Sequence, residues 1–167
     1  FVTEFEEVYQ TYFQDVYRYI RQLSGDEQTA EEVTSETFFK AMRSIGTFRG
    51  ECDLRVWLCQ IAKNTYYSYC RKNARTVSLD EEAAAEQPGT QNVEDEISRR
   101  ETVRQTQEAL HGLPEPYKEV FMWRAFADLS FKQIGQMFHK SDNWACVTYH
   151  RARAMIKSRM EGKGHEK

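Results

Sequence analysis

Four side chains in the middle of the sequence have the types and spacing to bind single-stranded nucleic acid. At 100° per residue, Lys63, Asn64, Tyr67 and Arg71 share one stripe of a helix with Gln60. Cations follow the phosphates of a strand, and an aromatic face stacks on bases without reading their identity. The pattern therefore predicts a face that binds nucleic acid. The alternative is a solvated basic face that happens to include a tyrosine.

A helix preceded by a glycine-containing loop must position these side chains. The loop is expected over residues 48–57 and the helix over residues 58–72. The opposite stripe of that helix is mostly apolar and is expected to face the core; it consists of Leu58, Ile61, Ala62, Thr65 and Tyr69. The basic stripe is expected to be exposed.

Two more helices precede the loop, over residues 4–23 and from the N-cap Asp26 to about Ile45. The second should bury Ala30, Val33, Thr34, Thr37, Phe38 and Ala41. Its outer face carries Glu32, Ser35, Glu36, Phe39 and Arg43. A large aromatic ringed by carboxylates indicates a protein partner with a basic contact patch. Packing of Phe39 on a neighbouring helix is the alternative.

The last third of the chain has the pattern of a helix-turn-helix. Ser130 and Gln133 form an S-x-x-Q capping box before a short apolar helix, and residues 139–142 form the turn. The second helix is basic, with no acid between Asn143 and Met160, which suits entry into a major groove. The residues expected to contact duplex DNA are Lys140, Ser141, Asn143, Trp144, Val147, His150 and Arg151. A generic helical hairpin is the alternative.

Charge divides the 167 residues into three parts. Residues 1–75 carry 10 basic and 11 acidic side chains, residues 76–101 carry 2 and 8, and residues 102–167 carry 11 and 7. The middle part has almost no large apolar groups, so it is expected to be a flexible acidic linker. An inert tether is the alternative to a functional linker.

Together, these patterns predict an all-α fold class. Two small helical domains, 1–75 and 102–167, are joined by the linker, and the second domain contains the helix-turn-helix.

The sequence offers no enzyme chemistry. It has no nucleophile–base set, phosphate loop, H-E-x-x-H motif or metal-ligand spacing, so neither catalysis nor a cofactor is expected. Cys59 and Cys70 would lie about 16 Å apart on one helix, too far for a disulfide. A bond between Cys52 and Cys59 stays open, but reduced thiols are favoured. No apolar run approaches membrane-spanning length and the acidic start is unlike a secretory signal, so a soluble cytoplasmic protein is expected.

Three stretches together resemble one family. Phe48-Arg49-Gly50, Trp57-Leu58, Ile61-Ala62-Lys63-Asn64 and Arg71-Lys72 resemble the promoter-melting region of bacterial sigma factors of the extracytoplasmic-function (ECF) group. Residues 30–41 resemble the sigma segment that docks on the polymerase clamp, although Ser35 stands where the family usually has Gln. Leu113-Pro114, Leu129-Ser130, Ile134-Gly135 and His150-Arg151-Ala152-Arg153 resemble the domain that reads the minus-thirty-five element.

The resemblance implies specific roles. Residues 1–75 would bind core polymerase and melt the minus-ten element, and residues 102–167 would read the minus-thirty-five element. The implied minus-ten residues are Arg49, Leu54, Arg55, Lys63, Asn64, Tyr67, Arg71 and Lys72. The turn residue His139 replaces a glycine found in many members, and the start of the last helix also differs, so no promoter sequence is implied.

The resemblance also implies partners. These are core RNA polymerase, through the clamp coiled coil of its largest subunit and the flap of its second-largest subunit, then promoter DNA, and an anti-sigma factor. The acidic linker would lie in the RNA channel of the polymerase. Two rival hypotheses are a one-component helix-turn-helix regulator, which would bind duplex DNA alone as a dimer, and a helical protein-binding adaptor with no DNA role.

Overall fold

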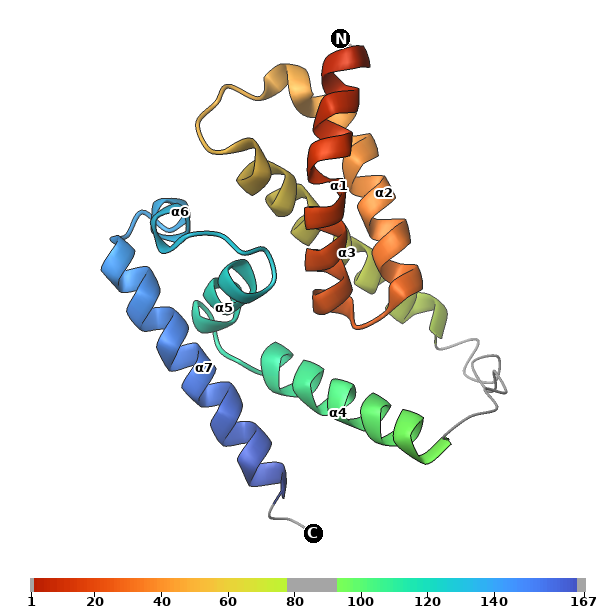
Figure 1. The fold of residues 1–167 in the computed structure, drawn as a ribbon, viewed down its shortest axis with the longest axis vertical. Helices are drawn as coiled ribbons and strands as arrows, with labels where there is room; N and C mark the ends of the chain where they lie inside the picture. The colour runs from red at the N-terminus through yellow and green to blue at the C-terminus, as the bar shows by residue number, and fades with distance from the viewer. Residues whose placement is uncertain (1, 78–92, 165–167) are drawn as a thin grey trace.

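The computed structural model describes residues 2–77 and 93–164, which fold into helices with no strand (Figure 1). This confirms the all-α prediction. The elements in chain order are α1 (Val2–Ser24), α2 (Glu27–Ser44), the 3-10 turn η1 (Ile45–Thr47), α3 (Leu54–Val77), α4 (Val93–His111), α5 (Tyr117–Ala125), α6 (Phe131–Met137) and α7 (Asp142–Gly164). None of these helices is long and apolar enough to cross a membrane.

The first half of the chain is a three-helix unit in which α1, α2 and α3 pack against one another. The core-facing stripe of α2 is as predicted, since it buries Ala30, Val33, Thr34, Thr37, Phe38 and Ala41. Asp26 is the N-cap, and its carboxylate accepts hydrogen bonds from the backbone N–H and the hydroxyl of Thr29 at 2.9 and 2.6 Å. These bonds hold the pKa of the Asp26 carboxyl below its usual value.

The helix that carries the basic stripe begins earlier than the sequence predicted. It starts at Leu54, so residues 54–57 are helical rather than loop. Asp53 explains this start, because its carboxylate accepts the backbone N–H of Arg55 at 3.0 Å and its carbonyl accepts the N–H of Trp57 at 3.1 Å. The helix continues past the predicted domain end to Val77.

The predicted linker, residues 76–101, extends too far, because α4 begins at Val93. Residues 93–101 belong to α4, whose exposed surface is stabilised by ion pairs at helical spacing, such as Glu96 with Arg100 at 3.2 Å and Arg104 with Glu108 at 2.9 Å. Three acids in its first turn suit the helix dipole. Residues 78–92 lie outside the described residues.

The second half packs α4, α5 and α6 against α7. The predicted capping box is present, with Ser130 Oγ accepting the Gln133 N–H at 3.0 Å and Gln133 Oε1 accepting the Ser130 N–H at 2.9 Å. At the turn, a Cβ on Gly135 would lie 2.8 Å from the carbonyl oxygens of both Lys140 and Ser141. Glycine at position 135 therefore allows the close approach that joins α6 to α7.

The two halves touch along α1, α3 and α5, and Figure 1 shows α5 on the side of the second half that faces α1 and α3. The rings of Tyr19 and Trp123 stack with centroids 5.4 Å apart, and both residues are fully buried. The Arg55 guanidinium donates a 2.6 Å hydrogen bond to the carbonyl of Ala127. The buried core is thus continuous between the halves.

Candidate nucleic-acid and protein interfaces

The basic stripe of α3 is less exposed than predicted. Asn64 and Arg71 are exposed, but Lys63 and Tyr67 are half-buried beneath α5. The Lys63 ammonium lies 2.7 Å from the carboxylate of Glu119 and 5.5 Å from the ring centroid of Trp123. The stripe faces outward from the three-helix unit, as its period required, and the second half of the chain then covers part of it.

Tyr67 is the aromatic member of the stripe. The ammonium of Lys118 lies 5.5 Å from its ring centroid. Burial, together with the nearby carboxylates of Glu115 and Glu119, raises the pKa of the Tyr67 hydroxyl to about 12. The side chain is therefore uncharged at neutral pH and can offer a ring face to a base without repelling phosphates.

The remaining predicted minus-ten residues are divided between surface and interior. Arg49 and Lys72 are exposed, and Leu54 is half-buried. Arg55 is held between the halves, with its Nε 3.8 Å from the carboxylate of Asp15. The structure therefore brings Lys63, Asn64 and Tyr67 together near the middle of α3 and places Arg49 on the loop before it.

The outer face of α2 is exposed, as predicted. The side chain of Phe39 is 56% exposed, which excludes its packing as a core residue. Glu32, Ser35 and Arg43 are exposed beside it, and Glu36 lies 3.5 Å from the ammonium of Lys40. Sequence reasoning missed Met42, which is 48% exposed. Its position three residues after Phe39 was the available signal, because residues i and i+3 share a helix face.

The predicted duplex face forms a groove at the start of α7. The groove has a volume of about 480 Å³ and is lined by Pro116, Tyr117, Ser141, Asn143, Trp144, Val147, Thr148 and Arg151. Five of the predicted residues thus share one surface, whereas Pro116, Tyr117 and Thr148 were not predicted. A hydrogen bond of 3.0 Å from the Trp144 N–H to Ser141 Oγ caps α7 and fixes the edge of the groove.

Two predicted duplex contacts lie outside the groove lining. Lys140 and His150 are both exposed. The ring of His150 packs near Tyr149, 5.3 Å between centroids, on the side of α7 that faces α6. Trp144, although it lines the groove, also packs on Phe138 with centroids 5.4 Å apart, so its ring supports the turn as well.

The described residues show no group of metal-ligating side chains. All four cysteines are free, so the Cys52–Cys59 bond that the sequence left open is not formed. Burial raises the pKa of the Cys59 thiol to about 12, which makes it a poor nucleophile at neutral pH.

The fold and these surfaces define a helical protein of two units, the second of which contains a helix-turn-helix. Comparison with known families agrees: the Sigma-70 region 2 model matches residues 8–76, and the Sigma-70, region 4 model matches residues 104–156. The ECF RNA polymerase sigma-E factor of Haemophilus influenzae is 31% identical over 139 residues, which cover 78% of this chain and 74% of the relative. The chain belongs to the ECF group of sigma-70-type RNA polymerase sigma factors.

Other relatives extend the match over nearly the whole chain. RNA polymerase sigma factor YlaC of Bacillus subtilis is 26% identical over 157 residues, which cover 93% of this chain and 91% of the relative. Among solved structures, the fold is similar to that of CnrH in complex with the cytosolic domain of CnrY, with a TM-score of 0.66 and 16% identity. The match covers 97% of this chain and 90% of the solved chain. It is also similar to RpoE from Bartonella quintana in complex with the anti-sigma factor NepR, with a TM-score of 0.61 and 19% identity. That match covers 95% of this chain and 97% of the solved chain.

Proposed function

We propose that this protein binds core RNA polymerase and directs it to promoters, where it starts transcription. The outer face of α2 docks on the polymerase, the basic stripe of α3 engages the minus-ten element as its strands separate, and the groove at α7 binds the minus-thirty-five element. The observation that carries this proposal is that the two family matches fall on the two halves that hold these faces. Sigma factors are initiation factors rather than enzymes, and we propose that this chain has no catalytic activity of its own.

The chemistry of each face supports its role. Phe39 and Met42 give α2 an exposed apolar centre with Glu32 and Glu36 around it, as expected for a protein interface with a basic partner. The groove at α7 combines Arg151 for phosphate with Asn143 and Ser141 for polar contacts. On α3, the aromatic Tyr67 lies among cations and an amide, which suits unpaired bases better than a closed duplex.

The proposal also assigns a role to each half of the chain, a cellular location and a further protein partner. Residues 1–75 form the polymerase-binding and minus-ten unit, and residues 102–167 form the minus-thirty-five unit. The protein acts in the cytoplasm, where its polymerase is. Because one similar fold was solved with the anti-sigma factor NepR bound and another with the cytosolic domain of CnrY bound, we also propose an anti-sigma factor that covers the polymerase-binding faces of this chain.

A run-off transcription assay tests the proposal. Bacterial core polymerase is incubated with a pool of genomic promoter fragments, with and without this protein, and the transcripts are sequenced. A sigma factor produces new start sites that depend on the protein. A one-component regulator would instead bind duplex DNA alone without creating start sites, and an adaptor would do neither. Absence of protein-dependent start sites would contradict the proposed function.

A further inference from the structure

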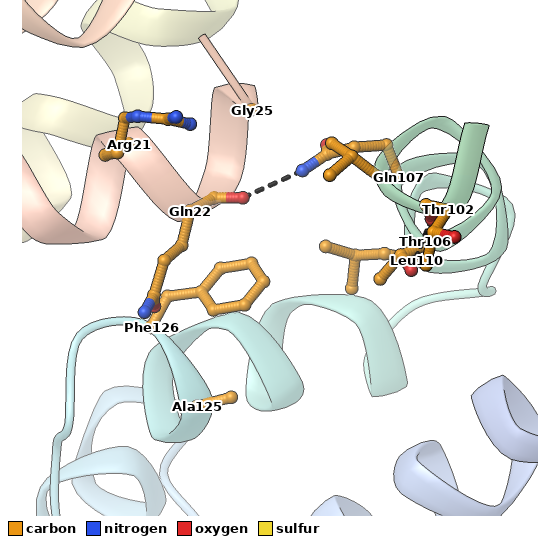
Figure 2. Close-up of a pocket in the computed structure, with 10 residues that line it drawn as sticks. Arg21, Gln22, Gly25, Thr102, Thr106, Gln107, Leu110, Ala125 and Phe126 are labelled. Carbon is orange, nitrogen blue, oxygen red and sulfur yellow. Dashed lines mark hydrogen bonds between the residues drawn. The ribbon is translucent and has the colours of Figure 1, made fainter. Parts of the chain in front are cut away.

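A cavity that the proposed function does not use lies where the two halves of the chain meet. It is bounded by the end of α1 and by α4 and α5, and its volume is about 590 Å³ (Figure 2). Pockets that bind small molecules have volumes of about 300–1,000 Å³ and combine apolar walls with a few polar groups. This cavity therefore has the size of a small-molecule site.

The apolar part of the lining includes Val103, Leu110 and Phe126. Figure 2 shows the side chains of Leu110 and Phe126 pointing toward one another, from α4 and from the C-cap of α5. The ring of Phe126 packs edge-on against Phe121, with 5.8 Å between centroids, which holds the ring in place. Val103 is 41% exposed, so part of this wall is open to a ligand. An apolar group that enters the cavity would remove this surface from water.

The polar part of the lining contains one cation and, among the described residues, no carboxylate. The cation is Arg21, which is half-buried. Within residues 2–77 and 93–164, its guanidinium makes no hydrogen bond and no ion pair. Asp26 acts on it only at longer range, since that carboxylate caps α2 through Thr29 and does not line the cavity. A half-buried cation of this kind favours an anionic ligand, which would form a charge-assisted hydrogen bond with it.

Gln107 supplies a second donor toward the same end of the cavity as Arg21, as Figure 2 shows. One N–H of its amide donates across the cavity to the carbonyl of Gln22 at 2.8 Å. Its amide oxygen lies 3.0 Å from Nε2 of His111. These two contacts fix the amide group, and because its nitrogen carries two hydrogens, one remains for a ligand oxygen. The cavity thus has a polar end with two donors and an apolar end.

We propose that this cavity is a binding site for a small amphipathic carboxylate. The carboxylate group pairs with the guanidinium of Arg21 and accepts the second N–H of Gln107, and the apolar tail lies between Leu110 and Phe126. A cationic ligand of the same shape is disfavoured, because its charge would meet Arg21 and no acid of the described lining offsets it. The inference does not depend on the proposed function, since these residues lie outside the polymerase-binding and DNA-binding faces.

Octanoate is the probe for this site, added to the whole chain without polymerase or DNA. The nuclear magnetic resonance signals of the Val103 and Leu110 methyl groups should shift and saturate, with a dissociation constant of about 1 mM or tighter. The melting temperature of the chain should rise with octanoate concentration, because a ligand that binds the folded state stabilises it. Octylamine and octanol, which have a similar tail without the negative charge, should bind at least about tenfold more weakly. Equal binding of the three probes, or no saturable shift at these two residues, would overturn the proposal.

Two substitutions with matched controls test the residues assigned to the site. Arg21→Gln should weaken octanoate binding about tenfold, whereas Arg18→Gln, the same change at an exposed position of α1, should bind like the wild type. Arg21→Lys keeps the charge and should restore most of the binding, which separates loss of the cation from loss of the fold. Val103→Asp places a carboxylate in the lining and should abolish octanoate binding. Val93→Asp makes the same change at an exposed position of α4 outside the cavity. If Arg21→Gln and Val103→Asp bind octanoate as their controls do, the cavity is not a carboxylate site.

Discussion

The guanidinium of Arg43 lies over the ring of Phe39, with 5.8 Å between its central carbon and the ring centroid, on the outer face of α2. The ring is 56% exposed although it follows directly after Phe38, which is 2% exposed. Two adjacent phenylalanines thus occupy opposite environments, since neighbouring residues on a helix point about 100° apart. This relationship lets stability and partner binding be tested separately.

Phe39→Ala should weaken binding of core polymerase by about 1–2 kcal/mol and leave the fold intact, because an exposed aromatic anchor contributes to an interface rather than to the core. The measurements are a titration of labelled protein with core polymerase and a thermal melt. The matched control is Phe38→Ala, which removes ring contacts with Tyr9 and Phe13 and should cost about 3–5 kcal/mol of stability. Normal holoenzyme assembly by Phe39→Ala with a lowered melting temperature would assign Phe39 to the fold.

Arg151→Ala should weaken duplex binding by the helix-turn-helix and lower the salt slope of binding by roughly one, because one phosphate contact is lost. The measurement is a series of binding isotherms at several salt concentrations. Arg153→Ala is the matched control, since it makes the same charge change at an exposed position outside the groove lining. Equal effects of the two substitutions would show that general charge, and not the groove, supports binding.

Gly135→Ala should destabilise the second half by about 1–3 kcal/mol, because the added Cβ would meet two carbonyl oxygens at 2.8 Å. Thermal unfolding measures this effect. The control is Gly162→Ala on α7, where a Cβ meets nothing within 4 Å and should be neutral or slightly stabilising in a helix. An unchanged melting temperature for Gly135→Ala would mean that the turn between α6 and α7 can open without loss of stability.

His111 should make stability depend on pH near neutrality. Burial at the end of α4, with a smaller contribution from Lys118, lowers the pKa of this imidazole. The unfolded chain therefore binds a proton more readily than the folded one, and stability falls as pH drops through about 6.5. His111→Gln should flatten the change in melting temperature between pH 7.5 and pH 6. A parallel pH dependence in both proteins would assign the effect to other groups.

Local periodicity made much of this molecule predictable. The stripe that includes Val33 and Phe38 followed from the helical period, and the capping box at Ser130 followed from two residue types at fixed spacing. Both features depend on residues within a few positions of one another. The same logic identified the face on which Phe39 is exposed.

The contacts between the halves could not be predicted in this way. Lys63 and Glu119 are 56 positions apart in sequence, and neither the period of α3 nor that of α5 indicates that the two helices meet. The early start of α3 at Leu54 depends on the carboxylate of Asp53, which the pattern placed in a loop. Positions such as these are decided by tertiary packing and by single capping bonds.

The ring of Tyr67 is the feature that most directly links the structure to promoter melting. Stacking of a base on an aromatic side chain contributes about 1–3 kcal/mol, so Tyr67→Ala should lower the population of open complex by roughly one to two decades. Tyr67→Phe keeps the ring and should melt promoters almost normally. Closed-complex binding should be similar in all three proteins, because the groove at α7 is unchanged.

The decisive measurement is the permanganate reactivity of unpaired thymines at a promoter recovered by run-off transcription, recorded beside a gel shift of the same holoenzyme. The account predicts that Tyr67→Ala loses thymine reactivity while its gel shift is retained, and that Tyr67→Phe loses neither. Normal reactivity in Tyr67→Ala would contradict the assignment of the α3 stripe to strand separation. So would equal loss of reactivity and gel shift, which would make Tyr67 a docking or folding residue.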